Sequence, residues 1–145
     1  GVFEAVASFL LRKTKNLRQL EMVLVFLCFF CSMLITNDVA LLTFVPFSFA
    51  VLGQLPEASG KKLLTPVVCL QTIAANLGSM LTPIGNPQNL YLYGKSQLSF
   101  SAFLQLMLPY TLLSAILLSV CIFYLGHPHR QQTAESRSYP AWKSV

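Results

Sequence analysis

Long stretches of this chain carry no charge, and this pattern most constrains how the chain can fold. Residues 22–56 contain a single charged residue, Asp38, while residues 63–94 and 98–125 contain none. Lys and Arg occur in short clusters between these apolar blocks, which is the charge pattern of membrane proteins. A spanning helix needs about 20 apolar residues. The blocks therefore predict an all-α, multi-pass membrane protein.

The composition excludes several other classes of protein. Hydrophobic residues make up 54% of the chain and charged residues 10%, whereas a soluble domain has about 25% charged residues. The net charge of +5 does not indicate nucleic-acid binding, because its carriers lie between apolar blocks. One Asp, four Glu and no phosphate-binding glycine motif leave almost no material for acid–base catalysis. We therefore expect neither an enzyme nor a nucleic-acid-binding protein.

The first apolar block predicts a re-entrant helical hairpin over residues 22–56. These 35 residues are too many for one spanning helix and too few for two. A polar Thr-Asn-Asp sequence at 36–38 leaves two arms, 22–35 and 39–52, of 14 residues each. At about 1.5 Å per residue each arm is about 21 Å long, and the hydrocarbon core is about 30 Å thick. Neither arm reaches across, so we expect the polar tip at mid-membrane.

The second block predicts a broken transmembrane helix over residues 63–94. An apolar helical run is followed at 78–89 by two Gly, two Pro and two Asn, which cannot continue a regular helix. Asn86 suits a helix N-cap and Pro87 suits the first helical position. A short second half-helix is therefore expected from residue 87. The third block, 98–125, has 28 residues and is long enough for one full span.

The charge clusters predict the orientation in the membrane. Basic residues at 12–18 and 61–62 flank the hairpin, so both of its ends belong on the cytoplasmic side. Lys95 alone lies outside, and the basic residues of a polar tail at 126–145 lie inside. We thus divide the chain into a partial transporter repeat, 1–125, with a cytoplasmic lead-in at 1–21, and a cytoplasmic tail. Because the chain does not begin with Met, we expect it to be part of a longer one.

The two interruptions suggest one shared site. Irregular backbone survives at membrane depth only when it is buried in protein or lines a watered cavity. Helix C-terminal ends there offer carbonyls to a cation, and helix N-terminal ends offer a positive dipole to an anion. Secondary transporters use this arrangement at the membrane midplane. Two plainer readings stay open: Asn37 and Asp38 could only cap a helix, and 78–89 could be a loop outside the membrane.

Two sequence motifs resemble those of the ion transporter superfamily. Ile-Thr-Asn-Asp-Val-Ala at 35–40 is similar to its first hairpin tip, and the sequence at 76–89 is similar to its broken helix. This superfamily includes divalent anion–sodium symporters, citrate transporters and arsenite permeases. The resemblance covers roughly residues 20–125 and implies the partial first half of an inverted-repeat transporter. It also implies a second repeat elsewhere in the protein, with a homodimer left open.

The resemblance also indicates which residues bind the cargo. Carboxylate symporters typically carry Ser-Asn-Thr at the tip, so Asn37 matches and Asp38 replaces a neutral Thr. The added negative charge argues against a dicarboxylate, and an Asn-Asp tip more closely resembles the arsenite-permease and antiporter branches. The residues expected to bind substrate or ion are Thr36, Asn37, Asp38, Thr82, Gly85, Asn86 and Asn89.

These inferences combine into one functional prediction. We expect a secondary active transporter in the cell membrane, plasma or inner. It would move a small inorganic or carboxylate anion, or an oxyanion, with Na⁺ or H⁺ as coupling ion and no other cofactor or metal. The bilayer and the missing second repeat are the other expected partners. The alternative is a small helical membrane protein with a structural or accessory role and no transport.

Overall fold

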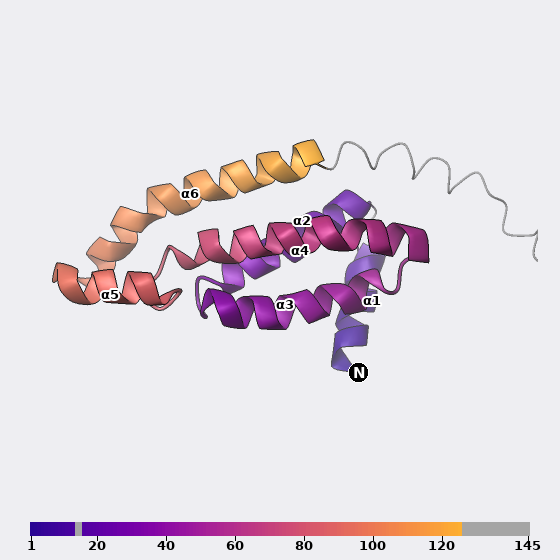
Figure 1. Ribbon diagram of the computed structural model, residues 1–145, viewed down its shortest axis with the longest axis horizontal. Helices are drawn as coiled ribbons and strands as arrows, with labels where there is room; N and C mark the ends of the chain where they lie inside the picture. The colour runs from indigo at the N-terminus through magenta and orange to yellow at the C-terminus, as the bar shows by residue number, and fades with distance from the viewer. Residues whose placement is uncertain (14–15, 126–145) are drawn as a thin grey trace, which may run out of the picture.

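The computed structural model describes residues 1–13 and 16–125, and these residues form α-helices joined by turns, with no strand (Figure 1). The predicted all-α class is confirmed for this part of the chain, and the predicted tail at 126–145 lies outside it. The helices are α1 (Val2–Lys13), α2 (Leu17–Cys31), α3 (Asn37–Leu52), α4 (Glu57–Ser79), α5 (Pro87–Ser96) and α6 (Phe100–Leu125).

Helices α2 and α3 form the two arms of a hairpin, and α4 packs along both of them (Figure 1). Apolar side chains from all three helices bury one another, among them Leu24, Val51 and Val67. The arms have 15 and 16 residues. At about 1.5 Å per residue, each is still shorter than the hydrocarbon core. The hairpin is therefore present, and its re-entrant placement in a membrane stays a prediction.

The predicted broken helix is also present as two helices. Helix α4 ends at Ser79, and α5 begins at Pro87, after the interruption at 80–86. Helix α5 runs to Ser96, where Gln97 adopts a left-handed conformation with φ of 53° and ends it. The ring of Tyr93 then packs edge-on against Phe103, at 5.6 Å between centroids, as the chain turns back into α6.

Helix α6 is long and apolar enough to cross a membrane, the only such helix in the described ranges. One side of it packs against α2 and α4, where Leu118 and Ile122 are buried. Its other side exposes large apolar residues such as Leu112 and Ile116. An exposed apolar face of this kind suits lipid or further protein rather than water.

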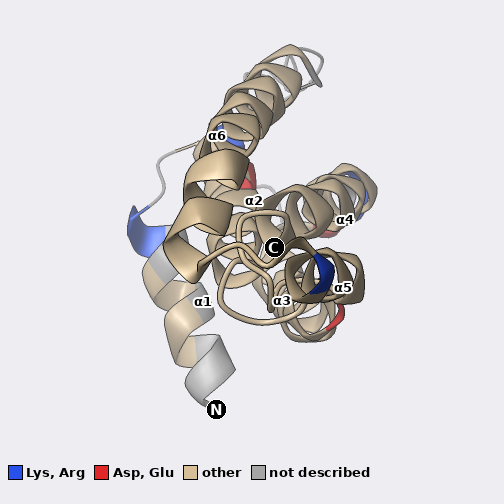
Figure 2. Ribbon diagram, turned by 90° about the vertical axis from the view of Figure 1, so that its left-hand side faces the viewer, with Lys and Arg blue, Asp and Glu red and all other residues tan. Residues whose placement is uncertain are grey.

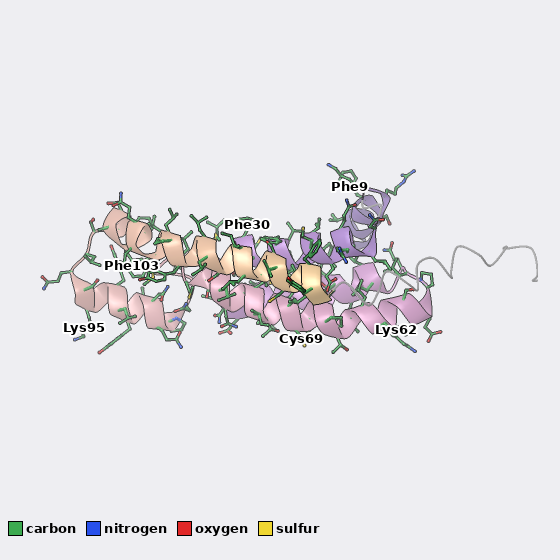
Figure 3. The ribbon with its side chains drawn as sticks, turned by 90° about the horizontal axis from the view of Figure 1, so that it is seen from above. Phe9, Phe30, Lys62, Cys69, Lys95 and Phe103 are labelled. Carbon is green, nitrogen blue, oxygen red and sulfur yellow. The ribbon has the colours of Figure 1, made fainter. Side chains whose placement is uncertain are left out.

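Few charged residues interrupt the ribbon, most of which is tan in Figure 2. Lys62 lies at one end of the long axis of the molecule and Lys95 at the other (Figure 3). Helix α1 runs across the hairpin near the Lys62 end, where Ser8 Oγ donates to Gln54 Oε1 at 3.4 Å (Figure 1). This separation is what the predicted orientation requires, while the membrane topology itself stays a prediction.

Candidate functional site

The hairpin tip is a tight turn that starts α3. After α2 ends, the backbone N–H of Ile35 donates to the Cys31 carbonyl at 3.0 Å, which closes the turn. Thr36 is the N-cap of α3, and its Oγ1 accepts from the backbone N–H of Val39 at 3.4 Å. A hydroxyl at this position satisfies one of the amide groups that a helix start leaves free. Thr36 thus has a structural role as well as its predicted place in the site.

The interruption in the broken helix is held by its own polar side chains. Asn86 is the N-cap of α5, as predicted, and its Oδ1 accepts from the Asn89 backbone N–H at 2.8 Å. Asn89 is buried, and its Nδ2 donates to the carbonyls of Met80 at 2.7 Å and Thr82 at 3.2 Å. These bonds satisfy carbonyls that the end of α4 leaves without helical partners.

The tip and the interruption meet, and we call their contact, residues 33–37 with 82–85, the tip–break junction. The backbone N–H of Asn37 donates to the Gly85 carbonyl at 3.0 Å. Thr82 Oγ1 donates to the Met33 carbonyl at 2.7 Å and accepts from the Gly85 N–H at 3.1 Å. The predicted convergence of the two segments is confirmed. What the junction binds stays a prediction.

Two glycines allow the backbones to approach this closely. A Cβ on Gly85 would collide with the backbone of Ser79, on the other side of the interruption. A Cβ on Gly78 would collide with the Phe29 carbonyl and the Ser32 hydroxyl of the hairpin. Close backbone approach is a standard requirement for glycine. The sequence predicted Gly78 only as a helix breaker, and Gly85 as a helix breaker and a site residue.

The junction gathers helix ends of both polarities. Helices α3 and α5 begin beside it, and α2 and α4 end beside it. Helix N-terminal ends carry a partial positive charge and C-terminal ends a partial negative charge. Asn37 Nδ2 donates to Asn76 Oδ1 at 3.0 Å, while Asn37 Oδ1 is buried and has no hydrogen-bond partner. An acceptor left free beside two helix C-termini is suited to a cation.

Asp38 lies in the first turn of α3 and is exposed. A carboxylate there is favourable beside the helix N-terminus. No described basic side chain forms a salt bridge with it. Asp38 is the one exposed residue among the predicted site residues. Thr36, Asn37, Thr82, Gly85, Asn86 and Asn89 make the bonds given above.

Three polar residues of α4 were missing from the predicted site. Asn76 bonds the tip directly. Ser79 Oγ accepts from Asn86 Nδ2 at 3.2 Å. Gln71 is fully buried and bonds both arms of the hairpin. The sequence did contain a signal for Asn76 and Gln71, because each places an amide side chain in an otherwise apolar, charge-free run.

Comparisons with known proteins agree on transport. A family model described as citrate transporter matches residues 1–143. Inner membrane protein YbiR of Escherichia coli (strain K12) is 36% identical over 85% of this chain and 32% of its own length. Uncharacterized transporter MJ0456 of Methanocaldococcus jannaschii is 35% identical over 69% of this chain and 28% of its own. Silicon efflux transporter LSI3 of Oryza sativa subsp. japonica is 29% identical over 86% of this chain and 25% of its own length. No solved structure matches the chain.

Proposed function

This chain belongs to the citrate transporter family, and on that premise we propose that the complete protein is a secondary active transporter of a small anion or oxyanion. The family and two of these relatives are named as transporters rather than enzymes. We place the protein in the cell membrane as a multi-pass protein, because one relative is named an inner membrane protein and α6 can span. The alternative of a purely accessory membrane protein lacks an observation that favours it.

The observation that carries the proposal is the tip–break junction. Two helix interruptions are bonded backbone to backbone, from Asn37 to Gly85, 48 residues apart in sequence. A loop and a hairpin needed only for packing would not have to place four helix ends together. Broken helices that meet in this way are how secondary transporters build ion and substrate sites at the membrane midplane.

The junction supplies groups for a cation and for an anion. Carbonyls at the ends of α2 and α4, together with Asn37 Oδ1, would coordinate Na⁺, or H⁺ would bind a neighbouring carboxylate. The backbone N–H groups of Asp38 and Gln88 would face the anion, because the other N–H groups that start α3 and α5 are bonded within the junction or to the helix caps and Pro87 has none. A cation beside the junction that favours anion binding there would give symport, whereas antiport would require the cation and the anion to exclude one another at the junction.

Asp38 favours some anions over others. Its carboxylate is exposed at the tip, where it would repel a substrate of high negative charge. We therefore favour an oxyanion or a singly charged anion over a dicarboxylate. The name of the rice relative, a silicon efflux transporter, supports testing a weak oxyacid first.

The rest of the machinery belongs to other parts of the complete protein. The chain spans about a third or less of the length of these relatives, with 32%, 28% and 25% covered. A second, inverted repeat would complete the site from its open side, where Asp38 and Asn76 are exposed. The exposed apolar face of α6 would contact lipid or a second copy in a homodimer.

The test is transport by the complete protein in liposomes. Uptake of citrate, arsenite and silicate is measured under an inward Na⁺ gradient, an inward H⁺ gradient or neither. We expect gradient-driven uptake of at least one of them, and we expect Asn37→Ala to abolish it. Asn16→Ala is the matched control, because Asn16 caps α2 without a side-chain bond. A folded protein that transports none of the three substrates under either gradient would contradict the proposed function and favour the accessory role.

A further inference from the structure

A buried polar cluster lies inside the hairpin, away from the junction. Gln71 of α4 is fully buried. Its Nε2 donates to Ser48 Oγ of α3 at 2.8 Å and to the Leu24 carbonyl of α2 at 3.3 Å. The Cys28 thiol donates in turn to the Gln71 backbone carbonyl at 3.7 Å. One residue of α4 is therefore bonded to both arms of the hairpin.

The surroundings of this cluster make its bonds specific. The neighbouring buried residues, such as Val25, Val51 and Ala74, are apolar and offer no other partner. The Nε2 of Gln71 is satisfied only by these two bonds, while its Oε1 is buried without a hydrogen-bond partner among the described residues. Between helices in lipid, where apolar contact gives no preference over the solvent, polar contacts of this kind decide how helices pack. The cluster therefore favours one register of the hairpin on α4.

We propose that Gln71 is a positioning residue for the tip–break junction. By bonding both arms, Gln71 sets how far along α4 the hairpin lies, and so keeps Asn37 within reach of Asn76 and Gly85. Asn76 follows Gln71 by five residues on the same rigid helix and bonds the tip at 3.0 Å. A slip of one residue moves a helix by about 1.5 Å, enough to misalign bonds of that length. The effect on transport rests on the proposed function; the effect on geometry does not.

The first arm of the test measures geometry alone. In a cysteine-free version of the complete protein, Leu34→Cys and Ile84→Cys place one thiol on each side of the junction, at exposed positions whose side chains make none of its hydrogen bonds. Gln71→Met then removes both amide bonds at similar side-chain length. We expect oxidative cross-linking to slow about tenfold, because two buried hydrogen bonds are lost. Leu70→Met is the matched control, since Leu70 is a buried apolar neighbour, and should leave the rate unchanged.

The second arm measures transport in the protein with its native cysteines. We expect Gln71→Met to raise the KM for substrate about tenfold with little change in the maximal rate, because the site is displaced rather than removed. If Gln71→Met does not fold, Ser48→Ala takes its place and should give a smaller rise, since only one of the two bonds is lost.

The outcomes separate this inference from the proposed function. Unchanged cross-linking in Gln71→Met, or equal slowing in Leu70→Met, would overturn the positioning role. If Gln71→Met does not fold and Ser48→Ala is used instead, an unchanged KM in Ser48→Ala would overturn the positioning role. A wild-type protein that transports nothing defeats the proposed function, while the cross-linking arm still decides whether Gln71 sets the register.

Discussion

Removing the Thr82 hydroxyl tests whether the junction holds the site together. Thr82→Val keeps the shape of the side chain and deletes its Oγ1. That atom bonds the tip at the Met33 carbonyl and the interruption at the Gly85 N–H. The first bond joins two separate segments, whereas Gly85 N–H retains a second acceptor, the Thr82 carbonyl at 3.3 Å. Thr82→Val therefore weakens mainly the hydrogen bonding between the tip and the interruption.

The size of the effect follows from the Met33 carbonyl, which loses its hydrogen-bond donor in Thr82→Val. Leaving a buried polar group without its partner costs about 1–3 kcal/mol. Since about 1.4 kcal/mol is a factor of ten, the docked tip becomes about five- to 150-fold less favoured. A ligand that needs the docked tip loses up to that factor in apparent affinity. We expect the lower part of this range, because the bond from Asn37 to Gly85 remains.

The assay compares Thr82→Val with Thr72→Val in the complete transporter. Thr72 is the matched control because its Oγ1 bonds only its own helix, at the Val68 carbonyl, and is exposed. Initial uptake rates over a range of substrate and coupling-ion concentrations give the apparent affinities. Wild-type affinity in a folded Thr82→Val, or an equal loss in Thr72→Val, would refute the argument that the junction positions the site.

Three further changes probe the glycine contact, the helix cap and the exposed carboxylate. Gly78→Ala forces the α2 and α4 backbones apart and should lower stability by about 1–3 kcal/mol, seen as a lower Tm; Gly94→Ala, which meets nothing within 4 Å, should not. Asn86→Ala removes the cap of α5 and should cost about 1 kcal/mol, measured as faster hydrogen exchange in its first turn. Asn86→Asp keeps the capping oxygen and should exchange more slowly than Asn86→Ala, although it loses the Nδ2 bonds to Ser79. Asp38→Asn should keep the fold, since Asn and Asp are similar at a helix start. We expect it to change the dependence of uptake on external pH and Na⁺, and an unchanged dependence would leave Asp38 with a structural role only.

The interruptions were predictable from the sequence because they depend on local chemistry. The helices are interrupted next to the polar residues 36–38 and within the run of Gly, Pro and Asn at 78–89. Such residues break a helix near their own position, so the breaks can be located from the sequence alone. The starts of α2 and α4 were less predictable. The prediction began each helical segment after the charged residues that precede the apolar blocks at 22 and 63, whereas both helices begin earlier and include charged residues. Helix α4 in fact begins at Glu57, and Glu57 pairs with Lys61 one turn later at 2.6 Å. Such i, i+4 pairs support a helix rather than end it.

The partners of the polar residues were not predictable, because they depend on which helix faces meet. Nothing local distinguishes Gln71 from the exposed Thr72 beside it, yet one is bonded to two helices and the other only to its own. The same holds for Asn76, whose partner lies 39 residues earlier. Periodicity gives the face of a helix but not the neighbour that the face contacts.

The bonds that build the junction are made largely by the main chain. Asn37 contributes its backbone N–H, Gly85 its carbonyl and N–H, and Met33 its carbonyl, while Thr82 supplies the one bridging side chain. The side chain of Asp38 takes no part in these bonds and is exposed. Tip side chains can therefore change without moving the backbone that gathers the helix ends. Under the proposed function, this division would let one arrangement of hairpin and broken helix serve different anions, with the main chain forming the site and the tip side chains selecting its occupant.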